Sequence, residues 1–370
     1  MRIALLLTSL DVGGAERQVL WLARHLALRG HTVRLFVLLP RGPGSLLGET
    51  EPTEFQVTFM GIRKRPWSVL TGLARAASEI RSFRPDVLHS HNFHGNLAGR
   101  LLGQVCQVPV VSTIHNVYEG GWQRMLAYRF TDAWSRRTIA VSEAVHERYL
   151  QMRVVDARKA GVISNGIEVA ELVPDAERHS RLRAEMGATE RDFVWIAVGR
   201  LTPAKDYPNL LRAFVQAAGA HLGIRLWIVG YGQPAYVDEM RKLAGELGIG
   251  KSVSWLGARR DIAALLDAAD GFVLASSWEG MPLAVGEAMA MAKPVIATDV
   301  GGVSELLGET GWLVPAKNPG ALAEAISRMM TLSGEERQKI GQAARARILE
   351  RFSMEAKVRE WEEVYRSVIR

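Results

Sequence analysis

The stretch Ser276–Ala290 reads Ser-Ser-Trp-Glu-Gly-Met-Pro-Leu-Ala-Val-Gly-Glu-Ala-Met-Ala, and the residues around it indicate what it forms. The apolar run Gly271–Ala275 directly before it predicts a buried parallel strand. The alanine- and methionine-rich composition from Leu283 onward favours a helix. Glu279 is therefore expected in a strand-to-helix loop, and Glu287 in or near the first turns of the helix. Ligands of open α/β sheets bind at such strand ends.

The two glutamates are eight positions apart and could bind different parts of one ligand. A loop carboxylate can accept hydrogen bonds from sugar hydroxyls, and free backbone N–H groups at the helix start can face an anion. The segment could thus hold a polyol and a phosphate together. The residues alone leave a second interpretation open, in which Glu279 is a solvated loop charge and Glu287 compensates the helix dipole.

Length and composition indicate two globular domains. The chain has 370 residues, of which 48% are hydrophobic and 23% charged, and each half is long enough for its own core. The apolar run at residues 1–8 is too short for a signal peptide or a spanning helix. A single cysteine, Cys106, excludes an intramolecular disulfide and fits a reducing compartment. We therefore expect a cytoplasmic protein.

The charge is unevenly distributed. Residues 1–170 hold 21 lysines and arginines against 13 acids, a net charge of +8, whereas residues 171–370 have a net charge of −1. Such asymmetry suggests an acidic partner or an anionic surface for the first half. Nucleic acid is not expected as the partner, because the sequence has no recognised binding motif or long basic run.

Strand and helix signals alternate almost from end to end, which predicts an α/β protein with parallel sheets. The expected strands span residues 2–7, 32–39, 55–60, 86–90, 109–113, 138–141, 161–164, 193–199, 225–230, 252–256, 271–275 and 294–298. A polar segment with Pro174 separates the two series and suggests a hinge. The expected division is a first domain at 1–168, a hinge at 169–188, a second domain at 189–352 and a final helix at 353–370.

Several residues that follow expected strands could contact a ligand. Gly13 and Gly14 precede a helix and could let the backbone approach a phosphate, although a tight turn explains them equally. His91 and His115 end neighbouring strands, where a hydrogen-bonded loop histidine is the ordinary alternative. Arg200 and Lys205 could converge on one anion, or both could simply be solvated.

In chain order, five motifs resemble those of the retaining glycosyltransferases of family 4. They are Gly-Gly-Ala-Glu at 13–16, Ser-Thr-Ile-His-Asn at 112–116, Asn-Gly-Ile at 165–167, Gly-Arg-Leu-Thr-Pro-Ala-Lys-Asp at 199–206, and the two glutamates at 279 and 287 with seven residues between them. Two positions depart from the family pattern, because Glu168 replaces an aspartate and Asp206 replaces the glycine that usually follows the lysine.

The resemblance implies the GT-B architecture, in which two Rossmann-like domains with parallel sheets face each other across a cleft. It also implies that the last helix crosses back to the first domain, where Trp361, Val364 and Tyr365 could pack. The catalytic residues that it implies are His115, Arg200, Lys205 and Glu279. The donor-binding residues that it implies are Gly13, Gly14, Gly230, Gly280, Met281, Pro282, Leu283 and Glu287.

The implied function is retaining transfer of a hexose from a nucleotide-diphosphate sugar to a glycan hydroxyl, in cell-envelope polysaccharide or glycoconjugate synthesis. A UDP-sugar is the favoured donor and GDP-mannose the second, and a lipid-linked glycan is the expected acceptor. The sequence contains no Asp-x-Asp pair that could bind a metal ion, so neither a metal nor a cofactor is expected. A nucleotide-sugar 2-epimerase of the same fold and a non-catalytic sugar-nucleotide-binding protein stay open as alternatives.

The stretch 121–137 suggests a surface that docks on an anionic membrane, on its cytoplasmic face. Helical spacing would place Trp122, Met125, Leu126, Phe130, Ala133 and Trp134 along one face, with Arg124, Arg129, Arg136 and Arg137 beside it. Such a mix suits an interfacial helix. An ordinary amphipathic helix that covers the first sheet is the alternative.

Overall fold

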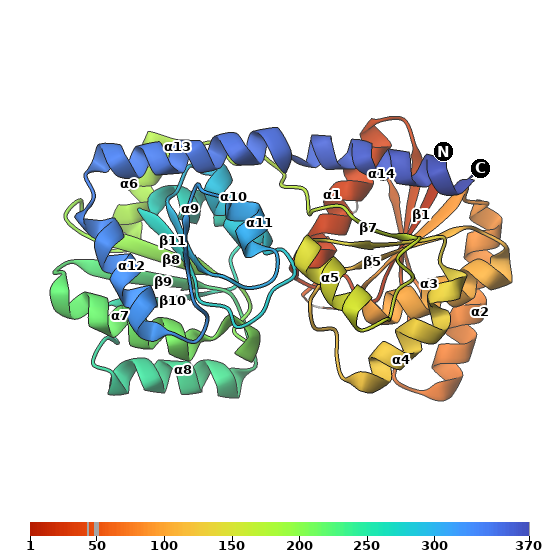
Figure 1. Cartoon of the computed structure of the whole chain (residues 1–370), viewed down its shortest axis with the longest axis horizontal. Helices are drawn as coiled ribbons and strands as arrows, with labels where there is room; N and C mark the ends of the chain where they lie inside the picture. The colour runs from red at the N-terminus through yellow and green to blue at the C-terminus, as the bar shows by residue number, and fades with distance from the viewer. Residues whose placement is uncertain (43, 48–51, 370) are drawn as a thin grey trace. The chain divides into compact units, whose positions relative to one another are not determined.

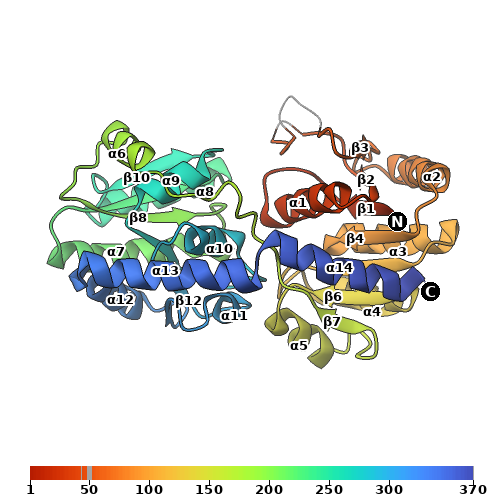
Figure 2. The same ribbon diagram turned by 90° about the horizontal axis from the view of Figure 1, so that it is seen from above.

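A computed structural model describes residues 1–42, 44–47 and 52–369. The chain divides into two compact units, each built on its own parallel sheet (Figures 1 and 2). Unit 1 comprises Met1–Gly166 together with the C-terminal segment from Met354, and unit 2 comprises Ile167–Ser353. The two parallel sheets confirm the α/β class predicted from the alternation of strand and helix signals.

In the described residues, unit 1 has a seven-stranded sheet in the order β3-β2-β1-β4-β5-β6-β7. Its strands are β1 (Arg2–Leu7), β2 (Thr32–Val37), β3 (Gln56–Phe59), β4 (Val87–His91), β5 (Val110–Ile114), β6 (Arg137–Ala140) and β7 (Ala160–Val162). Its helices are α1 (Gly14–Leu28), α2 (Pro66–Phe83), α3 (Asn92–Cys106), α4 (Trp122–Thr131), the 3₁₀ turn η1 (Asp132–Trp134), α5 (Glu143–Gln151) and α14 (Met354–Ile369). The central strands are buried along almost their whole length because helices cover both faces of the sheet.

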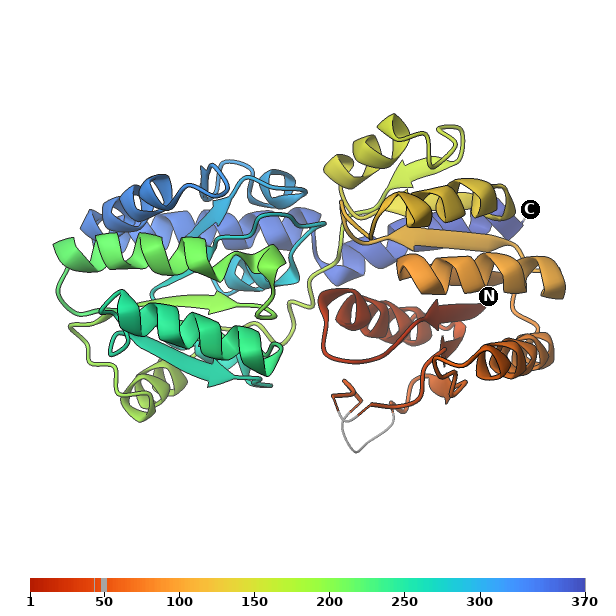
Figure 3. The same cartoon turned by 90° about the horizontal axis from the view of Figure 1, so that it is seen from below.

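Over its described residues, unit 2 has a six-stranded sheet in the order β10-β9-β8-β11-β12-β13. Its strands are β8 (Phe193–Val198), β9 (Ile224–Val229), β10 (Val253–Gly257), β11 (Gly271–Leu274), β12 (Val295–Thr298) and β13 (Trp312–Val314). Its helices are α6 (Ala176–Glu185), η2 (Pro203–Lys205), α7 (Tyr207–Ala220), α8 (Pro234–Glu246), α9 (Ile262–Ala268), α10 (Leu283–Ala290), α11 (Val303–Leu307), α12 (Pro319–Thr331) and α13 (Gly334–Arg351). Figure 3 shows α7 and α8 side by side, in agreement with their contacts.

The helix α14 packs on unit 1, although it follows the whole of unit 2 in the sequence. It lies beside α1 (Figure 1). Trp361 and Tyr365 are 4% and 0% exposed and share one core with Ile3 and Leu5 of β1. The alternate residues of β1 point to the other face of the sheet, toward α2 and α3. This packing confirms the expected return of the last helix to the first domain.

The segment expected as a hinge contains the helix α6, which is anchored on unit 2. The Asp175 side chain caps α6 by accepting two backbone N–H bonds. Arg183 is 7% exposed and donates to Asp270 Oδ2 at 2.8 Å, while Arg178 donates to Asp267 Oδ2 at 3.2 Å. The buried side of α6 is thus partly made of arginines, which a hydrophobic pattern does not detect.

The stretch 121–137 is not one helix, which corrects the expectation for this segment. The helix α4 ends at Thr131, η1 follows, and Arg137 already begins β6. Met125 is 8% exposed and faces the core, so it does not belong to the outer face that helical spacing predicted.

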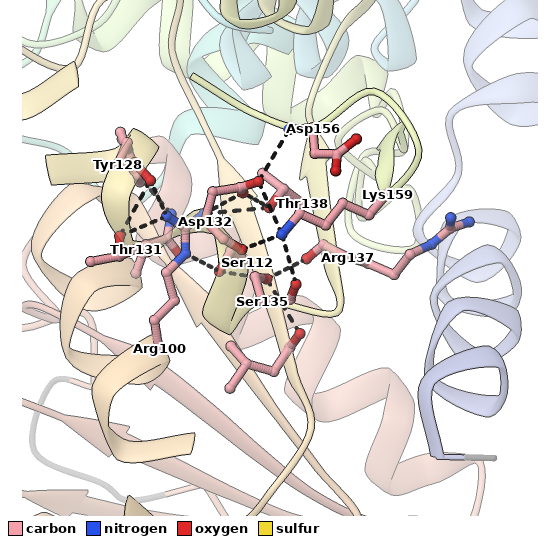
Figure 4. A network of polar contacts seen from close by, with 12 residues as sticks. Arg100, Ser112, Tyr128, Thr131, Asp132, Ser135, Arg137, Thr138, Asp156 and Lys159 are labelled. Atoms are coloured by element: carbon pink, nitrogen blue, oxygen red, sulfur yellow. Dashed lines mark hydrogen bonds and ion pairs between the residues drawn. The ribbon is translucent and has the colours of Figure 1, made fainter. Parts of the chain in front are cut away.

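A buried polar network lies beneath the end of α4 (Figure 4). Arg100 of α3 is fully buried and donates to the Tyr128 carbonyl at 3.1 Å and to Thr131 Oγ1 at 3.0 Å. Its guanidinium also pairs with Asp132 Oδ1 at 3.4 Å, and Lys159 Nζ lies 3.0 Å from Asp132 Oδ2. These contacts bind the main-chain carbonyls and hydroxyls where α4 gives way to η1, so they account for the end of the helix.

We predict that Arg100→Ala lowers the free energy of unfolding of unit 1 by about 3 kcal/mol, because it leaves Asp132 buried with only Lys159 to pair with. Arg158→Ala is the matched control, because the Arg158 side chain is 90% exposed and its pair with Asp156 lies at the surface. Urea unfolding should show a clear loss for the first variant and no measurable change for the second. If the two variants had equal free energies of unfolding, the buried contacts of Arg100 would not stabilise unit 1 as predicted.

Candidate active site

Two neighbouring strands of unit 2 bring together the loops that carry the predicted donor residues. β8 and β11 pair in parallel, so the loops that follow them leave the same edge of the sheet. The loops also bond directly, because the Ser277 N–H donates to the Ala204 carbonyl at 2.8 Å. Arg200 lies exposed on the first of these loops.

Lys205 and Glu279 form an ion pair across these two loops. Lys205 Nζ lies 2.5 Å from Glu279 Oε1, and the side chains are 19% and 10% exposed. Ser276 Oγ donates to the same carboxylate oxygen at 2.6 Å, and Thr298 Oγ1 donates to the Ser276 carbonyl at 2.7 Å. The sequence predicted that both charged residues belong to one site, and the structure places them in direct contact.

Asp206 fills a backbone position that the family pattern gives to glycine. Its φ is 46° and its ψ is 51°, in the left-handed region where aspartate is tolerated better than most residues. Its carboxylate accepts the Asn209 N–H as the cap of α7 and accepts the Ser277 hydroxyl at 2.9 Å. The aspartate therefore keeps the turn that glycine would allow and adds a bond to the neighbouring loop.

At this edge of the sheet, the main chain of two neighbouring loops passes so close to two positions that only glycine fits there. Gly230 has a φ of +150°, and a Cβ there would lie 1.9 Å from the Gly199 carbonyl oxygen. Gly301 has a φ of +56°, and a Cβ there would lie 2.0 Å from the Glu279 carbonyl oxygen. Any side chain at either position would displace the loop that holds Arg200 or the loop that holds Glu279.

The remaining predicted donor residues lie on the second loop and on α10. Pro282 caps α10, and Leu283 is its first residue. Met281 and Leu283 are each 5% exposed, and Glu287 is 1% exposed. Glu287 lies in the second turn of α10. An acid that compensates the helix dipole would be expected in the first turn.

The predicted residues of unit 1 lie at the corresponding strand ends of its own sheet. Gly13 caps α1 with an extended backbone and Gly14 is the first residue of that helix, after β1. His91 ends β4, and His115 follows β5, its neighbour in the sheet. His91 Nδ1 and His115 Nε2 are 3.1 Å apart.

Glu119 is a half-buried acid that sequence analysis did not identify. Its Oε1 atom accepts the His115 N–H at 3.1 Å, and its Oε2 atom accepts the Tyr128 hydroxyl at 2.5 Å. The side chain therefore fastens the loop after β5 to α4. The only signal in the sequence is its position between the histidine and two glycines, which does not predict burial.

Burial shifts the pKa values of this group in opposite directions. Burial lowers the pKa values of His89 and His91 well below 6.5, with a smaller contribution from neighbouring histidines, and lowers the pKa of His115 to about 3. Burial raises the pKa of Glu119 to about 7 against its hydrogen bonds, which act to lower it. The three imidazoles are thus neutral near neutral pH.

These shifts predict a loss of stability in mild acid. As the pH falls from 6.5 to 5, the unfolded chain goes from half to almost full protonation of the three histidines, whereas the folded chain keeps them neutral, so stability falls as the pH falls. Glu119 offsets the effect of one histidine, because its carboxyl group is protonated in the folded state over this range but largely ionised in the unfolded chain. The net difference therefore rises to about two protons near pH 5, where it corresponds to a slope of roughly 2.7 kcal/mol per pH unit. Urea unfolding at several pH values measures the slope, and a flat profile would contradict the neutral histidine group.

Most of the chain matches two glycosyltransferase family models. Residues 12–171 match the family model described as "Glycosyltransferase Family 4", and residues 179–347 match "Glycosyl transferases group 1". The chain is 27% identical to a glycogen synthase of Mycobacterium tuberculosis, over 96% of this chain and 91% of the relative. It is 26% identical to the UDP-Gal:alpha-D-GlcNAc-diphosphoundecaprenol alpha-1,3-galactosyltransferase of Escherichia coli, over 68% of this chain and 67% of the relative.

The fold has close counterparts among solved structures. Anabaena Alr3699/HepE, solved in complex with UDP-glucose, aligns with a TM-score of 0.89 and 23% identity, over 99% of this chain and 100% of that one. This similarity shows the GT-B fold, and the family matches and relatives show the enzyme class. The chain is therefore a hexosyltransferase that belongs to the GT-B glycosyltransferases of the group 1 and family 4 type.

Proposed function

We propose that this enzyme transfers a hexose from a UDP-sugar to a glycan hydroxyl with retention of configuration and without a metal ion. The Lys205–Glu279 pair carries this proposal, because a cation and an acid lie together at the strand-end edge of the unit 2 sheet, and a sugar diphosphate would need both. The E. coli relative is named for UDP-Gal, and the Anabaena structure contains UDP-glucose, which supports UDP over GDP-mannose as the donor nucleotide.

The ion pair also suggests how the site responds to its donor. A diphosphate carries negative charge that competes with Glu279 for the ammonium group of Lys205 and for the exposed guanidinium of Arg200. Glu279 is then available to accept hydrogen bonds from hydroxyls of the transferred sugar, while Glu287 on α10 is assigned to the ribose. Arg200 and Lys205 would stabilise the charge that develops on the departing diphosphate, which is the role that a metal ion fills elsewhere.

Retention requires no nucleophile from the protein if the acceptor hydroxyl attacks on the face that the diphosphate leaves. The pair of acids in this site does not resemble that of a glycosidase, in which two carboxyl groups flank the scissile bond. Glu279 and Glu287 instead lie on one loop and the helix that follows it. A 2-epimerase would use the same donor site, and product analysis with donor alone separates the two activities, because only the epimerase converts the free donor.

We predict that Lys205→Ala and Arg200→Ala each lower kcat/KM by a factor of about 30 to 1000, or roughly 2–4 kcal/mol of transition-state stabilisation. Lys251→Ala, which removes an exposed lysine of unit 2, is the matched control and should leave kcat/KM unchanged. The assay is run in saturating EDTA with a soluble acceptor analogue, and the wild-type enzyme should stay active there. Wild-type turnover in both variants, or activity that only Mg²⁺ or Mn²⁺ restores, would refute the assignment.

We further propose that the acceptor is a lipid-linked glycan and that α4 docks unit 1 on an anionic membrane. Trp122, Leu126, Phe130 and Trp134 recur every four residues and are 71%, 40%, 75% and 40% exposed. Arg124 and Arg129 are exposed on the same helix, within the basic half of the chain. Aromatic and basic side chains together suit the headgroup region of an anionic leaflet. No helix in the described part of the chain is long and apolar enough to cross a membrane.

Flotation with anionic vesicles tests this proposal. The wild-type protein should float with the vesicles at low salt and detach as the salt concentration rises, because the arginine contribution is screened. The double variant Trp122→Ser, Phe130→Ser should bind less at every salt concentration. Leu222→Ser, which removes a fully exposed leucine of unit 2, should bind like the wild type. If the wild type does not float at low salt, a small soluble acceptor becomes the better proposal.

A further inference from the structure

The histidines that end two adjacent strands of unit 1 are joined to each other. His91 Nδ1 and His115 Nε2 lie 3.1 Å apart, and His91 is 1% exposed. The outer nitrogen of each ring, Nε2 of His91 and Nδ1 of His115, is buried and has no hydrogen-bond partner among the described residues. Buried polar atoms usually have a partner, so this pair presents two atoms that a ligand could satisfy.

The bond between the rings restricts their tautomers. Burial keeps the pKa values of both imidazoles low, so each ring carries one proton near neutral pH. One ring must donate between Nδ1 of His91 and Nε2 of His115, and the other must accept. If His91 donates, His115 has its proton on Nδ1, and if His91 accepts, the Nδ1 atom of His115 is bare. The proton on His91 therefore determines what His115 offers to a ligand.

The position of His91 is itself held by a row of aromatic rings. The His89 ring centroid lies 4.0 Å from that of His91 and 4.4 Å from that of Trp361 on α14. His89 bonds through Nδ1 to the Tyr365 hydroxyl and through Nε2 to Thr113 Oγ1, each at 2.7 Å. Both nitrogens of His89 are thus occupied, so this ring can support His91 but cannot exchange a proton with it.

We propose that His91 is a positioning residue, whose hydrogen bond couples the tautomer of His115 to its own, so that His91 sets whether Nδ1 of His115 donates to a sugar hydroxyl or accepts from it. This inference rests on the proposed function and on the family resemblance, which makes His115 one of the implied catalytic residues. A hydroxyl can donate or accept, and a fixed partner selects one of these two orientations. A mixture of tautomers would hold the sugar correctly in only a part of the molecules.

Three substitutions of His91 separate its hydrogen bond from its volume. His91→Asn places an amide atom near the position of Nδ1 and can keep the bond to His115. His91→Phe keeps a ring but removes both nitrogens, and His91→Gln moves the amide toward the position of Nε2. We expect the Phe and Gln variants to lower kcat by about 10- to 100-fold, as the loss of an orienting partner of a functional histidine does elsewhere, with little change in KM for the donor. The Asn variant should stay within a few-fold of the wild type.

A readout independent of activity is the tautomer of His115 in two-bond ¹H–¹⁵N spectra, assigned with a His115→Gln variant. The wild type and His91→Asn should show one and the same tautomer, and His91→Phe should show a mixture or the other tautomer. Melting temperatures verify folding, and His91→Gln replaces the Phe variant if the latter does not fold. An unchanged His115 tautomer in the Phe and Gln variants overturns the inference, as does a changed tautomer with wild-type kcat. If Lys205→Ala and His115→Gln are both fully active, the proposed function fails instead, and the spectra still report on the histidine pair.

Discussion

A parallel sheet brings the carboxyl ends of all its strands to one edge, and both units of this enzyme depend on that constraint. In unit 2 the adjacent strands β8 and β11 bring Lys205 and Glu279 into an ion pair. In unit 1 the adjacent strands β4 and β5 bring His91 and His115 into a hydrogen bond. Each pair joins side chains that are distant in sequence, and neither needs a dedicated connecting segment, because the sheet already fixes where the two loops begin.

Much of the fold could be predicted from the sequence because buried parallel strands are continuous apolar runs. β1 has the expected bounds, and the other expected strands differ by one or two residues at one or both ends, whereas β13 was not among the expected strands. The departures have a common cause. The helix α6 is anchored through arginines such as Arg183, and α4 ends above the buried Arg100, so charged side chains form part of the interior. A hydrophobic pattern assigns such residues to the surface.

The sequence predicts which residues belong to the candidate site, but it does not predict the contacts between them. The motifs identified Lys205, Glu279 and His115, because each follows a strand in a recognisable local pattern. They did not indicate that Lys205 bonds to Glu279, because the order β8-β11 cannot be deduced from local spacing. Glu119 was not identified for a related reason. Its environment depends on the contact with Tyr128 of α4, which local sequence does not reveal.

The position of α14 has a consequence for biosynthesis. Tyr365 and Trp361 complete the core of unit 1 and support His89, yet they are translated after all of unit 2. While the ribosome makes unit 2, the first sheet is present without the 16-residue helix that covers Ile3 and Leu5. The part of that apolar face that α1 does not cover is exposed to chaperones and to aggregation throughout this interval. The unit that is synthesised first therefore completes its core only after α14 has been made. A chain that lacks α14 also lacks the contacts of Trp361 and Tyr365 with His89.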